Sequence, residues 1–263
     1  MISFEKRTAL ITGASSGIGK AFAEALSARG ANVILVARSK DKLSSLASEI
    51  KKQFKVKAGV IGADLSDPKA PPKIHAAVIK KGYQVDVLIN NAGFGTYGQF
   101  HTQSADKEHR EVMVNAAAVV QLTHLFLPSM VKKREGIIVN VASTGAFQPV
   151  PFSAVYGATK AFILSFSEAL WVEYRKQGIR VLALCPGTTD TNFFKARGDG
   201  ESAFGKKRTT ESVVKTALKA LERGKSYAVD GRLNYLLANL IRLSPRGLAA
   251  RTTGLVMRPK KRK

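Results

Sequence analysis

Short apolar runs that alternate with longer helical patterns constrain the fold of this chain more than any other feature. Seven runs have the length of single strands and are rich in aliphatic residues: 9–12, 32–36, 58–62, 85–89, 136–141, 180–184 and 226–229. Helical patterns lie between them, near 17–29, 40–54, 69–81, 105–133, 153–177 and 211–223. Repeated β-α units of this kind favour a parallel sheet with right-handed crossovers and helices on both faces. The sequence therefore predicts an α/β fold with a doubly wound parallel sheet of about seven strands.

The composition fits one large globular domain followed by a short extension. The chain has 263 residues, of which 45% are hydrophobic, and no linker or repeat interrupts the pattern before about residue 230. We therefore expect residues 1–230 to form one domain and residues 231–263 to form a basic C-terminal extension whose end is disordered. The single cysteine, Cys185, excludes an intramolecular disulfide and favours a reducing compartment.

Neither a secretory signal nor a membrane span is expected. The first residues lack the long apolar segment of a signal peptide, and no run approaches the ~18 apolar residues that cross a bilayer. The longest candidate, 116–120, is soon followed by Gln121 and His124. We expect a cytoplasmic protein that is soluble or peripheral at the inner face of a membrane.

A glycine-rich loop links the first strand to the first helix. It reads Thr12-Gly13-Ala14-Ser15-Ser16-Gly17-Ile18-Gly19. Glycines permit a tight turn and close approach of the backbone to a pyrophosphate, while the helix N-terminus offers N–H groups to the phosphates. The alternative is a simple turn, but the position between strand and helix favours a dinucleotide site. The predicted contacts come from Gly13, Ser15, Ser16, Gly17, Ile18 and Gly19.

The ends of the second and third strands suggest which dinucleotide binds. Arg38 and Ser39 stand where an NAD enzyme usually carries an acidic residue for the ribose 2′-hydroxyl. An arginine beside a serine suits a 2′-phosphate, so the sequence favours NADP(H) over NAD(H). The alternative is a solvated surface arginine. Asp64 and Leu65 could hold the adenine, although Asp64 could equally cap the next turn.

Tyr156 and Lys160 form the candidate chemical centre. Their i, i+4 spacing places both side chains on one helix face. A free tyrosine has a pKa of roughly 10, and a neighbouring ammonium group is expected to lower it toward neutrality. Ser143, at the end of the fifth strand, could hydrogen-bond a substrate carbonyl while the tyrosine protonates the alkoxide. Asn115 is either a core asparagine or an anchor for a water-linked proton path to Lys160.

The ordered set of these motifs resembles the short-chain dehydrogenases/reductases in their compact form. The residues that match in order and spacing are Thr12-Gly13-x-x-x-Gly17-x-Gly19, Asn90-Asn91-Ala92-Gly93, Asn115, Ser143, Tyr156-x-x-x-Lys160 and Pro186-Gly187. The resemblance covers roughly residues 5–230. It implies a Rossmann-type fold and NADP(H) as the cofactor. It also suggests, more loosely, the branch that contains 3-ketoacyl and hydroxysteroid reductases.

The same resemblance implies a role for each matching residue. Tyr156 would be the general acid/base, Lys160 would bind the nicotinamide ribose, Ser143 would orient the carbonyl and Asn115 would hold the relay water. Further cofactor contacts would come from Asn91, Ala92, Gly93, Pro186, Gly187, Thr188 and Thr191. Family members commonly pair through the long helices near 105–133 and 153–177, which implies a homodimer or homotetramer.

Aromatic loops after the strands suggest an apolar substrate. Phe94, Phe147 and Phe193 are expected near the reacting carbonyl, although some of them could pack in the core. Residues 195–208 are rich in Gly, Lys and Arg and are compatible with a mobile lid. Lys206, Lys207 and Arg208 could meet an anionic substrate there, although a solvated loop is the favoured interpretation. A lipophilic or acyl-type carbonyl, or the corresponding secondary alcohol, is therefore the predicted substrate.

The charge of the extension bears on its partners. The net charge is +23, and residues 231–263 contribute nine basic residues and no acidic one. Leucines at helical spacing from Leu233 to Leu240 could face an anionic membrane, the domain itself or a partner subunit. No aromatic residues alternate with the basic ones, so nucleic-acid binding is not expected. The alternative to an enzyme is a nucleotide-binding regulatory or docking protein with little turnover.

Overall fold

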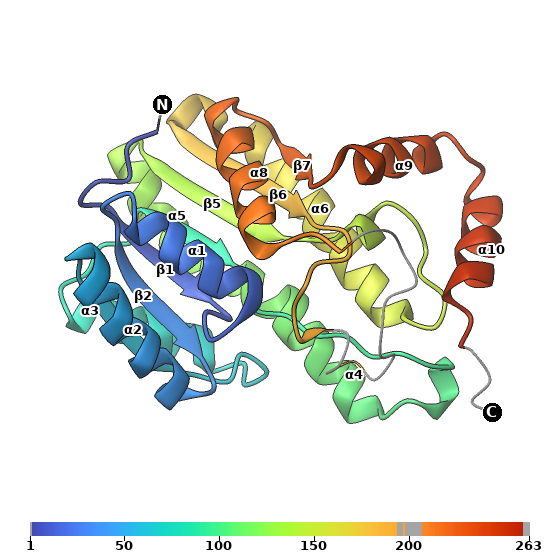
Figure 1. Cartoon of the computed structure of the whole chain (residues 1–263), viewed down its shortest axis with the longest axis horizontal. Coiled ribbons are helices and arrows are strands. Elements are labelled where there is room, and N and C mark those ends of the chain that lie inside the picture. Colours follow the sequence, from blue (N-terminus) through green and yellow to red (C-terminus); the bar gives the residue numbers. More distant parts are fainter. Residues whose placement is uncertain (1, 194–196, 198–206, 260–263) are drawn as a thin grey trace.

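A computed structural model describes residues 2–193, 197 and 207–259. Within these residues the strands form one parallel sheet in the order β3-β2-β1-β4-β5-β6-β7 (Figure 1). The strands are β1 Thr8–Thr12, β2 Asn32–Ala37, β3 Ala58–Gly62, β4 Val87–Asn90, β5 Gly136–Val141, β6 Ile179–Cys185 and β7 Tyr227–Val229. The prediction of a doubly wound, Rossmann-type sheet of seven strands is confirmed, with strand ends that differ by one or two residues.

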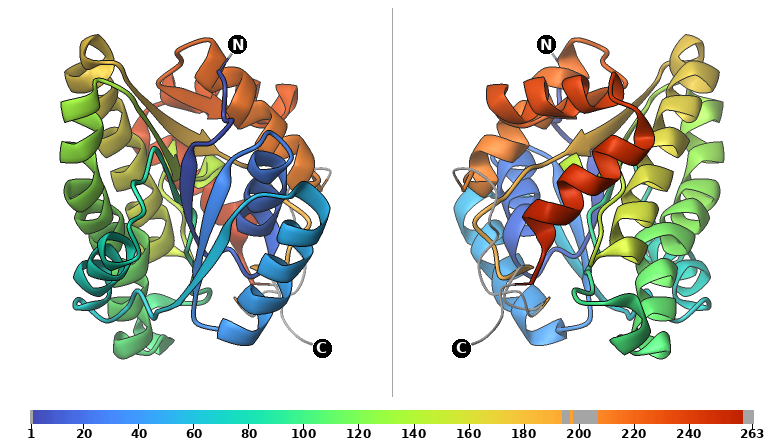
Figure 2. Two further views of the ribbon diagram at one scale, coloured as in Figure 1. Left: turned by 90° about the vertical axis from the view of Figure 1, so that its left-hand side faces the viewer. Right: turned by 90° about the vertical axis from the view of Figure 1, so that its right-hand side faces the viewer.

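Helices cover both faces of the sheet (Figure 2). They are α1 Gly17–Ser27, α2 Lys40–Phe54, α3 Ala70–Lys80, α4 Ala105–Val112, α5 Ala118–Lys133, α6 Ala154–Tyr174, α8 Thr210–Glu222, α9 Arg232–Arg242 and α10 Arg246–Met257. One core layer joins the sheet to α1, α2 and α8, and the other joins it to α3, α5 and α6. The central strand β5 is buried along its whole length, and its sequence is apolar except for Asn140, which accepts a hydrogen bond from Asn90 of β4.

The segment predicted as one helix over 105–133 is interrupted. A π-helical stretch, Met113–Ala117, joins α4 to α5 and contains Asn115. Such single-turn π segments are rare and occur frequently at functional sites. By length and composition, the combined helix Ala105–Lys133 could cross a membrane, with a mean hydropathy of 1.4 over its most apolar window. That test is also passed by core helices, and α5 packs its apolar side chains against the sheet.

The extension folds into α9 and α10 beside the carboxyl ends of β5 and β6 (Figure 1). A Cβ at Gly187 would overlap the Asn234 side chain of α9, and the Tyr97 hydroxyl donates a hydrogen bond to the Met257 carbonyl, 2.8 Å away. The two helices bury mainly the small side chains of Ala238, Ala249 and Thr253. The predicted disorder of the last residues concerns 260–263, which lie outside the described residues.

The sheet topology determines where a ligand can bind. β1 lies between β2 and β4, so the chain leaves β1 toward one side of the sheet and β4 toward the other. In open α/β sheets, ligands bind at such a switch point, outside the carboxyl ends of the strands. Gly13 follows β1 and Asn91 follows β4, which places both beside this point.

Candidate active site

The loop after β1 leaves no room for a side chain at Gly13 or Gly19. Gly13 has a φ of +65°, and a Cβ there would lie 2.8 Å from the Asn91 amide nitrogen. A Cβ at Gly19 would overlap the Gly13 carbonyl oxygen and lie 2.5 Å from the same nitrogen. The Asn91 amide donates hydrogen bonds to the carbonyls of Thr12, at 2.9 Å, and Gly13, at 3.3 Å. Asn91 therefore fixes the loop that was predicted to hold the pyrophosphate.

The N-terminus of α1 is open toward this loop. Its N-cap residue, Ser16, makes no side-chain capping bond, and the first turn carries no acidic residue. The free N–H groups and the positive end of the helix dipole suit a phosphate. Gly17 has a φ of +56°, and the Thr191 side chain lies 3.0 Å from where its Cβ would stand. The segment after β6 thus reaches the phosphate loop, on which Ser15 is half-buried and Ile18 packs against the core.

The second and third strand ends bring a cation and a carboxylate together. Arg38 is exposed, and its charge acts on Asp64. Burial acts to raise the pKa of Asp64, but hydrogen bonds from Ser66 and the charges of Arg38 and Arg110 hold it below the ordinary value. Asp64 accepts 3.0 and 2.8 Å bonds from the Ser66 backbone and hydroxyl, so the turn-capping alternative is realised. Leu65 is buried in the core, which leaves only its backbone for a ligand.

Asn115 lies at the centre of the site. Its amide donates to the Phe94 carbonyl at 2.9 Å and to the Thr159 hydroxyl at 3.2 Å, and its Oδ1 accepts from the Phe94 N–H at 3.1 Å. Both amide protons are therefore used by protein atoms. A Cβ at Gly93 would lie 3.0 Å from Asn115 Oδ1 and 3.4 Å from Lys160 Nζ. These two polar atoms flank a small space that glycine leaves open.

Tyr156, at the start of α6, meets the residue predicted to orient the carbonyl. Its side chain shares a hydrogen bond with Ser143, whose Oγ also accepts from the Gly145 N–H at 3.1 Å. Burial raises the pKa of Tyr156, while the Ser143 bond and the charge of Arg197 oppose the rise. At neutral pH this tyrosine is therefore a protonated phenol that can donate a proton.

Lys160 is buried below the tyrosine. Its Nζ donates to the Val141 carbonyl at 2.7 Å and lies 5.7 Å from the centre of the Tyr156 ring. Burial lowers the pKa of Lys160 to about 8. The expectation that Lys160 lowers the pKa of Tyr156 is not met, because the groups that lower it are Ser143 and Arg197. The reason is physical: desolvation of the phenol outweighs the attraction of an ammonium that is itself desolvated.

The three aromatic residues predicted at the substrate have different surroundings. The Phe193 ring lies 5.3 Å from the Tyr156 ring, beside the reacting group. Phe94 packs against the core layer that includes α5, and Phe147 packs on Tyr227 at 5.9 Å. Phe193 is therefore the one of the three that contacts Tyr156.

The loop after β6 continues the site. Pro186 accepts a 2.9 Å bond from the Thr144 N–H, and Thr188 is buried. Arg208, for which a solvated loop was favoured over contact with an anionic substrate, instead donates from its Nε to the fully buried Asp230 at 2.7 Å. Lys207 is exposed. Lys206 and most of the predicted lid, residues 195–196 and 198–206, lie outside the described residues.

Two charged residues of the site were missed by sequence reasoning. Arg197 is buried and stacks over Tyr97 and Phe193, with ring distances of 5.2 and 5.8 Å. Glu111 of α4 is fully buried, and its charge acts on Tyr156 and Lys160. In the sequence, Arg197 stands in a polar loop and Glu111 in a polar helical pattern, where charged residues are normally solvated. Only their burial in the folded chain identifies them as residues of the site.

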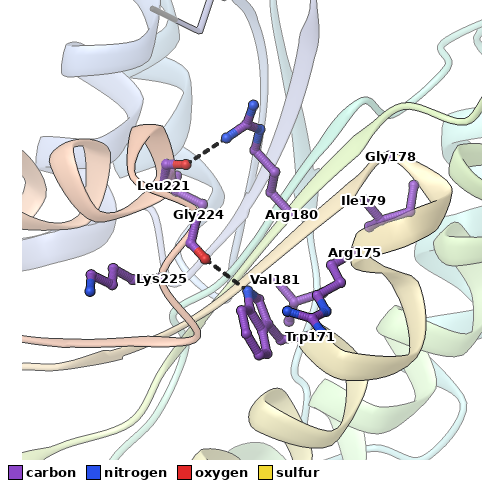
Figure 3. Close-up of a pocket in the computed structure, with 9 residues that line it drawn as sticks. All are labelled: Trp171, Arg175, Gly178, Ile179, Arg180, Val181, Leu221, Gly224 and Lys225. Carbon is purple, nitrogen blue, oxygen red and sulfur yellow. Dashed lines mark hydrogen bonds between the residues drawn. The ribbon is translucent and has the colours of Figure 1, made fainter.

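A pocket of about 330 Å³ lies elsewhere, at the amino end of β6 (Figure 3). Trp171 donates to the Gly224 carbonyl at 3.0 Å and carries Arg175 over its ring, while Arg180 donates to the Leu221 carbonyl at 2.8 Å. Because the candidate active site follows the carboxyl ends of the strands, this pocket is separate from it.

Comparisons with known proteins agree with this geometry. Residues 7–202 match the family model described as short chain dehydrogenase. The very-long-chain 3-oxoacyl-CoA reductase of Macaca fascicularis is 34% identical over 239 residues, covering 88% of this chain and 75% of that protein. The inactive hydroxysteroid dehydrogenase-like protein 1 of Pongo abelii is 39% identical over 184 residues, covering 68% of this chain and 55% of that protein.

A solved structure extends the agreement to almost the whole chain. The short-chain dehydrogenase from Sphingobium yanoikuyae in complex with NADPH superposes with a TM-score of 0.82 at 30% identity. The match covers 98% of this chain and 97% of that one, so it includes α9 and α10. The resemblance read from the sequence is thereby confirmed, and the chain belongs to the short-chain dehydrogenase/reductase family of oxidoreductases.

Proposed function

We propose that the protein is an NADPH-dependent reductase that transfers hydride to the carbonyl of a lipophilic or acyl-type substrate, or removes it from the corresponding secondary alcohol. The observation that carries the proposal is the hydrogen bond between Ser143 and the half-buried Tyr156, with the buried Lys160 beside them at the ligand-binding edge of the sheet. Turnover of NADPH with a carbonyl substrate, lost in Tyr156→Phe, tests the proposal.

The residues of the chain have distinct tasks in this reaction. Ser143 donates a hydrogen bond to the substrate oxygen, and the Tyr156 hydroxyl gives its proton to that oxygen as negative charge develops. Lys160 keeps two N–H groups beyond its bond to Val141, and these suit ribose hydroxyls. Asn115 positions the Phe94 segment through its amide. A water beside Gly93, between Asn115 Oδ1 and Lys160 Nζ, would complete a path that returns the proton.

The residues at the sheet edge fit NADPH, which would supply the hydride when bound. The glycine cradle and the open end of α1 suit its pyrophosphate, with Ser15, Ser16, Thr188 and Thr191 around it. Arg38 and Ser39 would bind the 2′-phosphate, and the Asp64 turn would border the adenine. Ala92 and Gly93 would lie along the ribose, while Pro186 and Gly187 would border the nicotinamide.

Replacement of Arg38 tests the choice of cofactor. We expect Arg38→Ala to weaken NADPH binding about 10- to 100-fold and to leave NADH binding nearly unchanged, because only NADPH carries the 2′-phosphate. Fluorescence titration of both cofactors measures the effect. Lys52→Ala is the matched control, since it removes an exposed cation from the far end of α2. Equal affinity of the wild-type protein for NADH and NADPH would contradict the assignment of Arg38.

A second candidate function is a nucleotide-binding protein with little turnover. The observation that favours it is the relative that is described as inactive. Against it stands the complete set of Asn115, Ser143, Tyr156 and Lys160, which the structure brings together. The two functions differ in whether bound NADPH reacts.

The apolar faces of the helices support two further proposals about partners. Phe162 and Val172 of α6 are 46% and 58% exposed, which supports pairing of subunits as a homodimer or homotetramer through the long helices. On α9, α10 and the turn between them, nine large apolar residues are 47–85% exposed: Leu233, Tyr235, Leu236, Leu237, Leu240, Leu243, Leu248, Leu255 and Val256. Each of these leucines is more than half exposed, so its own domain covers only part of its side chain. Because all the charged residues of this segment, 231–263, are basic, we propose an anionic membrane as its partner.

Vesicle binding tests this surface. We expect the full chain to sediment with phosphatidylglycerol vesicles and not with neutral phosphatidylcholine vesicles. The triple variant Leu236→Ser, Leu240→Ser, Leu243→Ser should bind at least about tenfold more weakly, because three leucines leave the bilayer. Val172→Ser, an exposed apolar residue of α6, is the control. Unchanged vesicle binding of the triple variant would show that these leucines do not contact the membrane. If light scattering gave the triple variant half the molar mass of the wild type, the leucines would form a subunit interface instead.

A further inference from the structure

Helix α4 buries a single side chain, and that side chain is the carboxylate of Glu111. Glu111 is 0% exposed, whereas Asp106 on the same helix is exposed. Burial of an ionisable carboxyl group costs free energy unless the group is paired and hydrogen-bonded. A buried carboxyl group next to titratable residues of a ligand site therefore calls for a functional explanation.

One carboxylate oxygen ties α4 to the start of α6. Glu111 Oε2 accepts hydrogen bonds from the backbone N–H and the hydroxyl of Thr96, both at 2.9 Å. The Thr96 carbonyl in turn accepts a 2.6 Å bond from the hydroxyl of Ser153, which immediately precedes α6. Ser153 stands three residues before Tyr156. This chain of bonds therefore holds the turn of α6 that carries the tyrosine.

The other carboxylate oxygen, Oε1, is buried and has no hydrogen-bond partner among the described residues. Its charge acts on both Lys160 and Tyr156. Within the described part of the chain, Lys160 forms no ion pair, so Glu111 acts on it through space and not through contact. In a site shielded from water, a charge acts over such a separation more strongly than at the surface.

Glu111 and Lys160 change their ionisation in neighbouring ranges of pH. Burial raises the pKa of Glu111 to about 7, against the bonds from Thr96 that lower it. Burial lowers the pKa of Lys160 to about 8, and the charge of Glu111 opposes that change. Near neutral pH, each group therefore favours the charged form of the other.

Three further titratable or charged residues surround Glu111 and Lys160: Glu108, Arg197 and Cys185. Glu108, one turn earlier on α4, raises the pKa of Glu111. Arg197 lies on the far side of Ser153, 3.4 Å from its hydroxyl. On β6, burial raises the pKa of Cys185 to about 12, so this thiol stays neutral while Glu111 and Lys160 titrate. Glu111 is thus the acidic group that is ionised and acts on Lys160 in the working range.

Resting on the proposed function, we propose that Glu111 is a positioning residue of the reductase: through Thr96 and Ser153 its carboxylate fixes the turn that presents Tyr156, and its buried charge stabilises the ammonium group of Lys160. Glu111→Gln separates the two roles, because glutamine keeps an oxygen for Thr96 and removes the charge. Reduction would then continue in the variant, with a changed dependence on pH.

The direct test is the titration of Lys160 in the ligand-free full chain. In protein labelled with carbon-13 at the lysine ε position, the resonance missing from Lys160→Met identifies Lys160. We expect its midpoint near pH 8 in the wild type and lower by on the order of one pH unit in Glu111→Gln. Asp106→Asn, which removes an exposed carboxylate from the same helix, should leave the midpoint unchanged. The same midpoint in Glu111→Gln as in the wild type would overturn the proposal.

Two further measurements separate this proposal from the proposed function. The alkaline limb of the pH profile for kcat/KM should move to lower pH in Glu111→Gln, since loss of the carboxylate favours the deprotonated forms of both Lys160 and Tyr156. If Glu111→Gln does not fold, the wild-type protein is labelled with carbon-13 at the glutamate side-chain carboxyl groups and titrated instead. A carboxyl resonance that titrates near pH 7 supports the proposal, and the absence of such a resonance overturns it. A wild type without reductase activity would refute the proposed function while these titrations still report on Glu111.

Discussion

Tyr156→Phe is expected to lower the rate of carbonyl reduction by about 10²- to 10⁴-fold while NADPH binding stays close to that of the wild type. Phenylalanine keeps the ring that packs 5.3 Å from the Phe193 ring, so the shape of the site is retained. What it removes is the hydroxyl that bonds Ser143 and holds the transferable proton. Steady-state kinetics with NADPH, together with a fluorescence titration of the cofactor, separate the loss of rate from any loss of binding.

Tyr83→Phe is the control for this substitution. Tyr83 packs at the edge of a core layer, away from Ser143 and Lys160, and its loss of a hydroxyl should leave the rate unchanged. A Tyr156→Phe protein that keeps more than about a tenth of the wild-type rate would show that another group supplies the proton.

Gly19→Ala should abolish measurable NADPH binding and lower the free energy of unfolding by about 1–3 kcal/mol. The added Cβ would overlap the Gly13 carbonyl oxygen and stand 2.5 Å from the Asn91 amide nitrogen. Since neither the backbone of Gly13 nor the Asn91 amide can move without breaking the bonds that fix the loop, the phosphate cradle must open. Cofactor titration and thermal unfolding measure the two effects.

Gly247→Ala provides the matched glycine control. A Cβ at Gly247 meets nothing within 4 Å, and alanine favours the helical conformation of α10. We expect this variant to bind NADPH normally and to be at least as stable as the wild type. Wild-type affinity for NADPH in Gly19→Ala would mean that the glycine loop is only a turn.

The sequence carried enough information for the sheet and the order of the site residues. Strands buried on both faces must be largely apolar, and the glycines at 13, 17 and 19 are required by the close approach of Asn91 and Thr191. Both signals are local or periodic, so they can be read without knowledge of tertiary contacts. Ser143 could be placed at the ligand edge because strand ends of a parallel sheet meet there, and Tyr156 and Lys160 could be paired because their spacing puts them on one helix face.

What the sequence did not predict depends on burial and on the pairing of distant segments. The π segment at Asn115 has no distinctive composition, and the sequence left two roles open for the Asp64 carboxylate, a turn cap and a ligand contact. The pKa of Tyr156 follows from desolvation, which no spacing of residues reveals. Glu111 lies in a polar helix, where an acidic residue is normally solvated. Its position against Thr96 exists only in the folded chain.

The most direct measurement of the central claim follows the hydride itself. NADPH deuterated at the reactive C4 position is incubated with the full chain and with carbonyl substrates that include 3-oxoacyl thioesters and bulky ketones, and the products are analysed by mass spectrometry. The account predicts one deuterium on the carbinol carbon of the alcohol for each NADPH oxidised, and none when Tyr156 is phenylalanine over the same time. Bound NADPH that stays unoxidised with every carbonyl, or that is oxidised without deuterium in an alcohol, would contradict it.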